Sequence, residues 1–476
     1  MFRLLVGFLL FTGLCHAQGP TSVWTLGDSL TLTFDSTAGP SVSGMHSMYG
    51  IESVATLSDE SGNLLAYSNG ATLWNRADSV MFNSEDLSGP SVMSSASSGT
   101  VFIPADNSQG LYWYLVIGAE GAFPGDTGGI ALSLIDMSLD GGLGGIVDTF
   151  KDRAVRPAIA EYLHVVRHSN GEDWWIYTRP DSSSAFLNKD LLTRSGFVRY
   201  PPEHIGFTLS SKVGNLSSSP NGCYLGIAGY GESTSDSGAY AVLEIDRANG
   251  QLALLDYVKT KDLVYGLAFA PNSELLYVGR ISPPEILQID YLSAPEFSVE
   301  VIYSNPTNLV GIGQFRNGDD GKIYFPISSN APPGTNIVQD DFLGAIERPN
   351  VRGVDCMVNP SYLFLDASRD QYAGLPAFPN YVVDPESCKD TVVASSFEQV
   401  QPVNGNVFEN NVGLQFSILL PEGSIAIYNS SGQLISRELV QFRALDLSSL
   451  DPGVYYIRQI LSSGRRRSQR IVVGQF

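Results

Sequence analysis

The 476-residue sequence is poor in charged residues and in lysine. Charged residues make up 16% of the chain, against about a quarter in ordinary globular proteins. Lysine accounts for only seven of the 28 basic residues. Coiled coils and long helical bundles need many charged side chains on their exposed faces. The composition therefore disfavours both of these architectures.

Basic charge is also scarce overall. The net charge is −21 and the isoelectric point is about 4.5, so the phosphate backbone of a nucleic acid would be repelled. We expect no nucleic-acid partner. Residues 396–476 differ from the rest, with seven arginines against six acids, which indicates a separate unit at the C-terminal end.

Long apolar runs are lacking as well. Residues 1–17, MFRLLVGFLLFTGLCHA, have one early positive charge, an apolar stretch of about eleven residues and small residues at the end. They predict a cleaved signal peptide. A membrane anchor is the alternative, although the stretch is shorter than the roughly 20 residues that span a bilayer. A lipid anchor on Cys15 is disfavoured because Leu14 precedes it. We expect no transmembrane segment in the mature chain.

Cysteine is rare, and cleavage of residues 1–17 would leave three. No two of them have zinc-ligand spacing. In an oxidising compartment at most one internal disulfide can form. We predict the pair Cys356–Cys388, which flanks a probable domain edge, and a buried free thiol at Cys223 within an apolar strand pattern.

Apolar residues reach 43% of the chain and glycine is abundant, which favours a folded, β-rich protein. One kind of turn recurs, each time before a short apolar strand. Measured at one residue of each turn, the steps are 48, 61, 51, 51 and 48 residues, which is the size of a propeller blade. The positions measured are Gly62, Gly110, Gly171, Gly222, Ser273 and Gly321.

The strands after these turns look like one strand position seen six times, and a second strand with an acidic exit follows in several units. Repeated hairpins bury their faces by stacking on their neighbours, so we predict a seven-bladed β-propeller over residues 18–385. We expect residues 22–34 to close the ring by pairing with strands within 351–364. A β-sandwich array and a β-helix are the alternatives.

Several segments carry a resemblance to a known family. VATLSDESGNLLAYSNGATLWN (54–75), GGIALSLIDMSLDGGLG (128–144), HVVRHSNGEDWWIY (164–177), SSSPNGCYLGIA and LAFAPNSELLYVG together resemble large secreted β-propeller-like proteins of Bacteroidetes, some of which are associated with gliding motility. The resemblance covers roughly residues 22–380. It implies the propeller fold and says little about chemistry.

After a linker at 386–395, residues 396–476 change pattern to short strands typical of a small immunoglobulin-like β-sandwich. IAIYNSSGQLIS and LDLSSLDPGVYYIRQILSSGRRRSQRIVV resemble the type A C-terminal sorting domain of the Bacteroidetes type IX secretion system. The resemblance implies export through that machinery, and a secreted or outer-surface location. It also makes Gly432, Gly453, Tyr455 and Arg470 determinants of recognition or folding. A carbohydrate-binding or spacer sandwich is the alternative.

Catalytic motifs are absent from the sequence: there is no GxSxG elbow, HExxH, P-loop or GxGxxG pattern. His164 and His168 would share a strand face and could form a metal pair, but packing of His168 at the turn before Trp174 is favoured. Asp319 and Asp320 lie in an acidic turn and are candidate calcium ligands, with solvated turn residues as the favoured interpretation. No other cofactor is expected.

Aromatic residues suggest one binding surface. Trp74, Trp113 and Trp174 are candidate ligand-facing residues for a glycan, although alternate residues of propeller strands usually form the core between blades.

The sequence thus predicts an exported β-propeller that binds glycans or surface proteins and serves adhesion or a gliding-related function. The alternative is an extracellular propeller enzyme, a glycoside hydrolase or lyase acting on polysaccharide. Its carboxylate pair cannot be chosen from sequence. An enzyme should bring acids, histidines or arginines with shifted pKa values together at one mouth of the channel, whereas a binder should not.

Overall fold

The structure is a computed structural model, and it describes most of residues 19–381 and four strands near the C-terminus. The described residues are 19–35, 38–85, 87, 97–105, 111–119, 128–181, 185–231, 238–292, 297–305, 310–329, 341–365, 374–381, 423–429, 434–440, 453–461 and 466–473.

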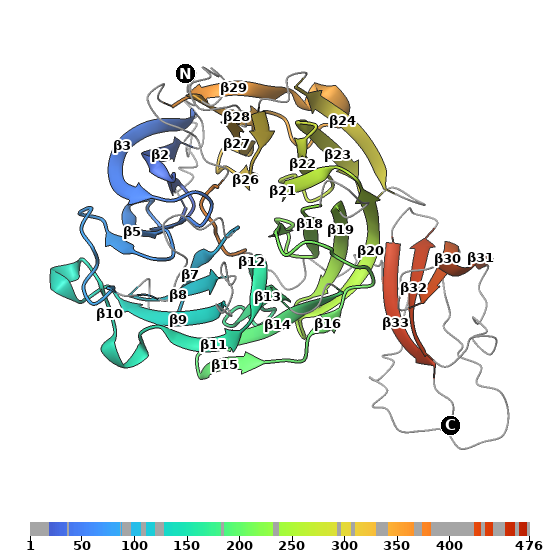
Figure 1. The fold of residues 1–476 in the computed structure, drawn as a ribbon, viewed down its shortest axis with the longest axis horizontal. Coiled ribbons are helices and arrows are strands. Elements are labelled where there is room, and N and C mark those ends of the chain that lie inside the picture. The colour runs from blue at the N-terminus through green and yellow to red at the C-terminus, as the bar shows by residue number, and fades with distance from the viewer. Residues whose placement is uncertain are drawn as a thin grey trace, which may run out of the picture.

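Seven antiparallel sheets follow one another along the chain and stand around a central axis, which makes a seven-bladed β-propeller (Figure 1). The predicted fold class is confirmed for this part of the chain. Blade 1 contains β1 (Val23–Thr25), β2 (Asp28–Asp35) and β3 (Gly39–Tyr49), and blade 2 contains β4 (Ala55–Ser58), β5 (Leu64–Ser68) and β6 (Leu73–Asn75). Blade 3 contains β7 (Thr100–Pro104), β8 (Tyr112–Ala119), β9 (Gly129–Asp136), β10 (Gly145–Ile146) and β11 (Arg153–Pro157).

The remaining blades each have four principal strands. Blade 4 contains β12 (Ile159–Arg167), β13 (Trp174–Pro180), β14 (Phe186–Thr193), β15 (Gly196–Arg199) and β16 (Glu203–His204). Blade 5 contains β17 (Gly214–Ser218), β18 (Tyr224–Gly229), β19 (Gly238–Asp246) and β20 (Gln251–Thr260). Blade 6 contains β21 (Leu263–Phe269), β22 (Leu276–Ser282), β23 (Glu285–Asp290) and β24 (Ser298–Ser304). Blade 7 contains β25 (Val310–Ile312), β26 (Arg316–Asn317), β27 (Ile323–Ser329), β28 (Phe342–Ile346) and β29 (Val358–Phe364).

The recurring turns join the innermost strand of a blade to its second strand. The apolar strands that follow them are the second strands β5, β8, β13, β18, β22 and β27, so the prediction of one repeated strand position is confirmed. The turn at 108–110 lies outside the described residues. Blade 1 has a tighter connection at Gly27, where a Cβ atom would lie 1.7 Å from the carbonyl oxygen of Gly50. Blade 1 therefore lacks the sequence pattern of the other six turns.

The acidic exits are the last residues of third strands. Asp136 and Asp246 end β9 and β19, and their carboxylates accept hydrogen bonds from backbone amides two residues on, at 2.8 and 2.9 Å. Such Asx turns give the chain a defined exit from the strand. Asp290 ends β23 and has a different partner, described below.

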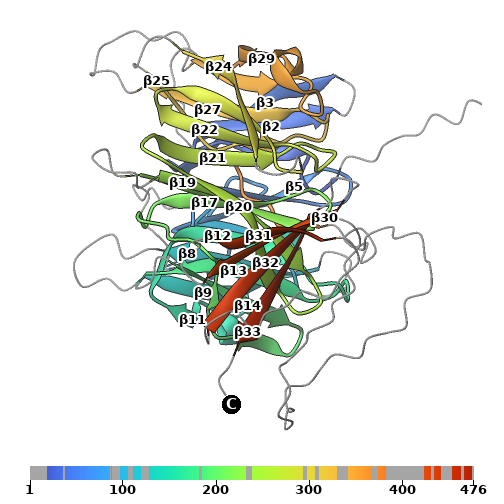
Figure 2. The ribbon, with the colours of Figure 1, turned by 90° about the vertical axis from the view of Figure 1, so that its right-hand side faces the viewer.

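Side chains between consecutive blades form the core. Seven buried apolar clusters each combine residues from two neighbouring blades, including the pair formed by blades 7 and 1. In the side view of Figure 2 the sheets of blades 6, 5 and 4 lie face to face, one above another. Both faces of each sheet are covered by neighbouring blades. Many strands therefore have consecutive apolar residues in the sequence, and others alternate apolar and polar residues.

Ring closure differs from the prediction. The strands of blade 1 pair with one another and β29 pairs with β28, and no strand pairing joins residues 22–34 to 351–364 within the described chain. Blade 7 completes its own sheet, so the ring closes through side chains. Trp24 packs against Phe34 at 4.5 Å and Tyr324 at 5.8 Å between ring centroids, and the Thr21 hydroxyl donates to Asp319 at 2.5 Å.

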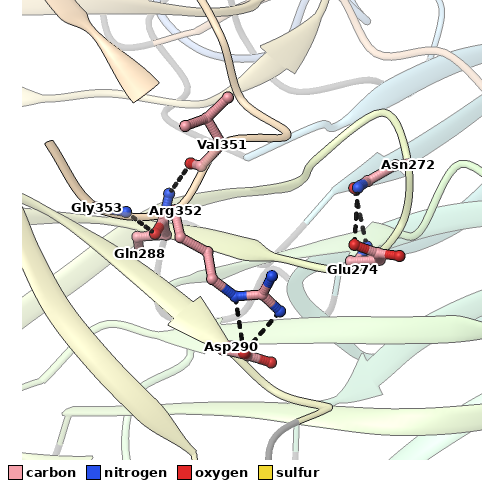
Figure 3. Close-up of polar contacts among 7 residues, drawn as sticks. All are labelled: Asn272, Glu274, Gln288, Asp290, Val351, Arg352 and Gly353. Atoms are coloured by element: carbon pink, nitrogen blue, oxygen red, sulfur yellow. Dashed lines mark hydrogen bonds and ion pairs between the residues drawn. The ribbon is translucent and has the colours of Figure 1, made fainter. Parts of the chain in front are cut away.

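Polar contacts at the blade edges add to these cores. Figure 3 shows the loop before β29 held against blade 6: the Gln288 amide donates to the carbonyl of Val351 at 2.8 Å and accepts from the amide of Gly353 at 2.7 Å. In the same view Arg352 pairs with Asp290 at 2.8 Å. These contacts fix the register of blade 7 on blade 6.

Residues 374–381, here called the channel segment, run inside the ring (orange in Figure 1). Their backbone amides donate to blades 2 and 4 along the way, from Gly374 to Ile51 at 3.0 Å, from Ala377 to Val54 at 2.9 Å and from Asn380 to Val165 at 2.9 Å. The side chains of Leu375, Ala377 and Phe378 are buried in the cores of blades 7–1 and 3–4. The chain therefore fills part of its own channel.

The predicted disulfide is wrong. Cys356 is a buried free thiol at the end of a short 3-10 helix (Gly353–Cys356), within the core of blades 6 and 7. Burial raises the pKa of its thiol to about 11. Cys223 is the disulfide-bonded cysteine instead, and its partner lies outside the described residues. No local pattern indicates which cysteine stays a free thiol, because burial of a particular cysteine depends on blade packing.

The C-terminal strands β30 (Gly423–Asn429), β31 (Leu434–Val440), β32 (Gly453–Leu461) and β33 (Arg466–Val473) form one antiparallel sheet in the order β31-β30-β32-β33. Gly453 and Tyr455 lie on β32, and Arg470 lies on β33 opposite Tyr456. Gly432 lies outside the described residues. A second sheet, which a sandwich requires, stays a prediction. In the described part of the chain, no helix has the length and apolar character to cross a membrane.

Candidate functional site

Polar side chains from five blades meet inside the ring, near the ends at which the innermost strands begin. Glu52 precedes β4, Ser97 precedes β7, Glu161 lies on β12, Tyr265 lies on β21 and Gln314 lies between β25 and β26. These five residues are called the mouth cluster. Burial of a carboxylate costs free energy unless the group has hydrogen-bond or charge partners. The two acids in this otherwise apolar region therefore need partners, which the rest of the cluster supplies.

The Tyr265 hydroxyl is the centre of this cluster. It lies 2.6 Å from Ser97 Oγ and accepts a 3.4 Å hydrogen bond from Gln314 Nε2. Ser97 Oγ also donates to Glu161 Oε2 at 3.2 Å. Glu52 forms a side-chain hydrogen bond with the same tyrosine. The hydroxyls of Tyr265 and Ser97 therefore connect the two carboxyl groups.

Burial shifts the titration of the cluster. It raises the pKa of Glu52 to about 7, and the hydrogen bond from Tyr265 only partly opposes this rise. Burial, reinforced by the charges of Glu52 and Glu161, raises the pKa of Tyr265 well above its usual range. Tyr230 on blade 5 also has a raised pKa, because of burial and the Glu52 charge. Glu52 thus exchanges its proton near neutral pH.

Access to the cluster is uneven. Ser97, Glu161, Tyr265 and Gln314 are buried, whereas Glu52 is half-buried. The channel segment fixes one side: the side-chain Oε1 atom of Gln314 accepts from the Leu375 backbone amide at 3.0 Å, and a Cβ atom on Gly374 would lie 2.4 Å from Glu52 Cα. A molecule from solvent would therefore meet Glu52 first.

Chemically, this set of groups can both donate and accept hydrogen bonds, as recognition of sugar hydroxyls requires. A carboxyl group with a pKa near 7 can also act as a general acid or base. Both properties are present at one mouth of the ring.

A second polar group lies toward the other end of the innermost strands. His164 on β12 bonds with Ser218 on β17, and Asn380 of the channel segment donates to Ser218 Oγ at 2.9 Å. His168 is held apart from His164: its ring stacks on Trp175 and its Nδ1 accepts from the Asn170 amide at 2.9 Å. The predicted packing of His168 at this turn is confirmed. No group of three metal-ligating His, Cys, Asp or Glu side chains occurs among the described residues.

The acidic turn is used for protein contacts. Asp320 pairs with Lys322 at 2.6 Å and accepts from the Tyr324 hydroxyl at 2.8 Å, while Asp319 accepts from Thr21. These partners occupy the carboxylates that the calcium hypothesis assigned to a cation. Asp319 joins the segment before blade 1 to blade 7, whereas Asp320 bonds within blade 7.

The aromatic candidates do not face a ligand. Trp74, Trp113 and Trp174 are between 2% and 9% exposed and belong to the cores of blades 1–2, 2–3 and 3–4. Trp74 stacks on Tyr67 with ring centroids 5.5 Å apart. The favoured interpretation, a core between blades, is confirmed, and the alternative of a glycan platform formed by these three residues is wrong.

No sequence pattern singled out the mouth cluster as a whole. One pattern could have indicated part of it, namely an acid within an otherwise apolar strand, as Glu161 is in Ile159–Arg167. Glu52 and Ser97 lie in connections between blades, where polar residues are ordinary. Only closure of the ring brings them to Tyr265.

No family model matches the sequence, and no curated protein matches it. Solved structures similar to the chain include Kuenenia stuttgartiensis hydrazine synthase, with 14% identity, a TM-score of 0.41 and coverage of 68% of this chain and 99% of that chain. A Pseudomonas aeruginosa periplasmic gluconolactonase has 12% identity, a TM-score of 0.36 and coverage of 75% and 98%. A putative 6-phosphogluconolactonase from Bacteroides uniformis has 14% identity, a TM-score of 0.37 and coverage of 59% of this chain and 79% of that chain. At these identities and TM-scores the similarities carry no argument about activity.

Proposed function

We propose that this protein is an exported β-propeller that binds a hydroxyl-rich ligand, such as a surface glycan, at the mouth cluster. The observation that carries the proposal is the convergence of two carboxyl groups, two hydroxyls and an amide from five blades on one mouth of the ring. Binding at this surface serves adhesion or a gliding-related function.

Export is supported by the two ends of the sequence. Residues 1–17 resemble a signal peptide, and residues 396–476 resemble a type IX sorting domain with Gly432, Gly453, Tyr455 and Arg470 as determinants. The secretion machinery is then a partner of the tail, and the secreted or outer-surface location follows from it.

Glycan-array binding of the secreted protein tests the ligand. Glu52→Gln should weaken binding of any retained glycan at least tenfold, because Glu52 is the half-buried member of the cluster that solvent reaches. Glu300→Gln, an exposed change on β24, is the matched control and should bind normally. Equal binding by both variants would place the ligand elsewhere.

A second candidate function is acid–base catalysis on polysaccharide. The convergence of Glu52 and Glu161, with the pKa of Glu52 raised to about 7, is the arrangement that the sequence analysis expected of an enzyme rather than of a binder, so this function is tested beside binding. Release of reducing ends or unsaturated sugars from a polysaccharide panel would reveal such an activity. Catalysis requires that Glu52→Gln abolish turnover while glycan binding persists. If a glycan binds but is never cleaved, catalysis is excluded for that glycan and only the binding function is supported.

Peptide mapping of the protein from culture medium and washed cells tests export. Loss of residues 1–17 and of the last eighty or so residues is expected for sorting. A cytoplasmic protein that keeps its tail would contradict the proposed location.

A further inference from the structure

A chain of hydroxyl groups runs through the mouth cluster from one carboxyl group to the other. Glu161 Oε2 lies 3.2 Å from Ser97 Oγ, and Ser97 Oγ lies 2.6 Å from the Tyr265 hydroxyl. The Tyr265 hydroxyl in turn forms a hydrogen bond with the carboxyl group of Glu52. Glu161, Ser97 and Tyr265 are at most 7% exposed, so solvent has little access to the inner part of this chain.

Backbone contacts place Glu52 at the outer end of the hydroxyl chain. Gln314 donates to the Tyr265 hydroxyl at 3.4 Å and accepts from the Leu375 amide at 3.0 Å. Gly374 precedes Leu375 and approaches Glu52 so closely that a Cβ atom on Gly374 would lie 2.4 Å from Glu52 Cα. The position of Glu52 beside Tyr265 therefore follows from these contacts and does not depend on its titration.

The hydrogen bonds of the chain fix how many protons it contains. Three links join the two carboxyl groups, and each link needs one proton between its two oxygen atoms. The hydroxyls of Ser97 and Tyr265 supply only two. Their oxygen atoms, 2.6 Å apart, are too close to lack a hydrogen atom between them. One of the two carboxyl groups therefore carries the third proton, and the pair has one negative charge rather than two.

The charges next to the chain agree with a single negative charge. Burial raises the pKa of Glu52, and the charges of Glu52 and Glu161 add to burial in raising the pKa of Tyr265. No described arginine or lysine is among the groups that shift the pKa of Glu52 or of Tyr265. Without a cation beside them, two linked carboxyl groups do not both ionise at the pH at which an isolated one does.

Blade 5 contributes the other titratable groups beside the chain. Tyr230 follows β18, and burial together with the Glu52 charge raises its pKa. Lys212 precedes β17, and its carbonyl accepts from the Glu161 amide at 3.1 Å while its ammonium group pairs with Asp181. The charge of this lysine is therefore paired with an acid outside the chain.

We propose that Glu161 stores one proton for Glu52 and exchanges it with Glu52 through the two hydroxyls between them. Each hydroxyl oxygen receives a proton from one side and gives its own proton to the other side. At each of these oxygens one O–H bond forms and one breaks, so both hydroxyls stay neutral. With the proton on Glu161, Glu52 is a base at the mouth of the ring, and after the exchange it is an acid.

Glu161 and Ser97 are positioning residues in this arrangement, because Glu52 is the group that a ligand reaches. Use of the stored proton in binding or catalysis rests on the proposed function of the mouth cluster. The hydroxyl chain and its proton count are properties of the ligand-free protein, whether or not a glycan binds there.

Titration of the carboxyl groups of the ligand-free, full-length protein tests the stored proton, by carbon NMR or infrared difference spectroscopy. Ser97→Ala is the decisive variant, because Ser97 bonds with Glu161 and Tyr265 and not with Glu52 in the described structure. Its loss frees the Tyr265 proton to stay with an ionised Glu52. The apparent pKa of Glu52, about 7 in the wild-type protein, should then fall by about 1 or more, a tenfold change in proton dissociation.

Glu161→Gln should lower the same apparent pKa, because the new amide group supplies the third proton without an acid. Glu300→Gln changes an exposed carboxyl group on β24 and is the control that should leave it unchanged. A Glu52 titration that stays near pH 7 in Ser97→Ala overturns the proposal. If only Glu161→Gln lowers it, charge repulsion acts without a shared proton, and the proposal is likewise overturned.

A proton count on the wild-type protein keeps the test valid if Ser97→Ala does not fold. At about pH 6 the infrared band of protonated carboxyl groups should exceed that of the double variant Glu52→Gln, Glu161→Gln by one group per molecule. A difference of none or of two contradicts the stored proton. Glycan binding together with such a contradiction would leave the proposed binding site in place and remove only the proton exchange.

Discussion

Glu52 illustrates how a single residue acquires its properties from distant parts of the chain. Its neighbours in sequence are unremarkable, but Tyr265 and Gly374 reach it from blade 6 and from the channel segment. Removal from water raises its pKa, and the raised pKa connects stability to pH.

We predict that Glu52→Gln stabilises the protein increasingly from pH 4.5 to pH 7. In this range the unfolded chain has already lost the Glu52 proton while the folded protein keeps it, so wild-type stability falls as pH rises. The advantage of the variant is constant above pH 7 and at most about 3 kcal/mol, less where solvent screens the half-buried group. Urea unfolding of both proteins at pH 4.5, 6 and 8 measures it. A pH-independent difference would mean that Glu52 titrates normally.

Arg156 and Asp190 form a buried ion pair between blades 3 and 4. Burial raises the pKa of Asp190 even with the arginine in place. Arg156→Ala should cost about 3–5 kcal/mol, because it leaves a buried carboxylate unpaired. Arg194→Ala, which breaks an exposed pair with Glu172, should cost less than about 1 kcal/mol in the same chemical denaturation assay. Equal costs would show that Asp190 gains water or a new partner.

At the scale of elements, the second strand of each blade was predictable because a turn with a fixed pattern precedes it. The channel segment was not, since Gly374-Leu-Pro-Ala-Phe378 has no strand or helix periodicity. Its place is decided by amides that bond to blades 2 and 4. It joins cores that are distant along the ring.

We predict that the channel segment is a structural part of the ring. Leu375→Ala removes a fully buried side chain and should cost about 2–5 kcal/mol, measured by chemical denaturation. Val354→Ala, at an exposed site, is the control and should be nearly neutral. A neutral Leu375→Ala would indicate that the segment leaves the channel in solution.

For the whole molecule, the manner of ring closure sets the weakest interface. All neighbouring blades are held by side chains, but blades 7 and 1 come from opposite ends of the propeller sequence, so no short connecting segment joins them as it joins the other pairs. Local opening is expected where few backbone hydrogen bonds cross an interface.

Trp24→Ala should therefore cost about 3–5 kcal/mol and increase amide hydrogen exchange first in β1–β3 and β25–β29. Val299→Ala on the exposed outer strand of blade 6 is the matched control. Exchange that rises evenly over all seven blades would show that the ring opens as one unit and not at this interface.

The sequence by itself determined the blade size, because a period of about fifty residues is local information repeated along the chain. It showed six of the turns, and the prediction of seven blades came from dividing the length of the region by this period. It also determined the strand that follows each turn and the acidic ends of third strands. It favoured the core between blades for Trp74, Trp113 and Trp174, and their burial agrees with this. Which blade covers each of them was decided only by the tertiary structure.

Only the tertiary structure decided the closure of the ring, the free thiol at Cys356 and the mouth cluster. Each of these joins residues from different blades, so no local pattern encodes it. The physical reason is that a propeller buries side chains only between neighbouring blades and around a shared axis, and both exist only after the ring has closed.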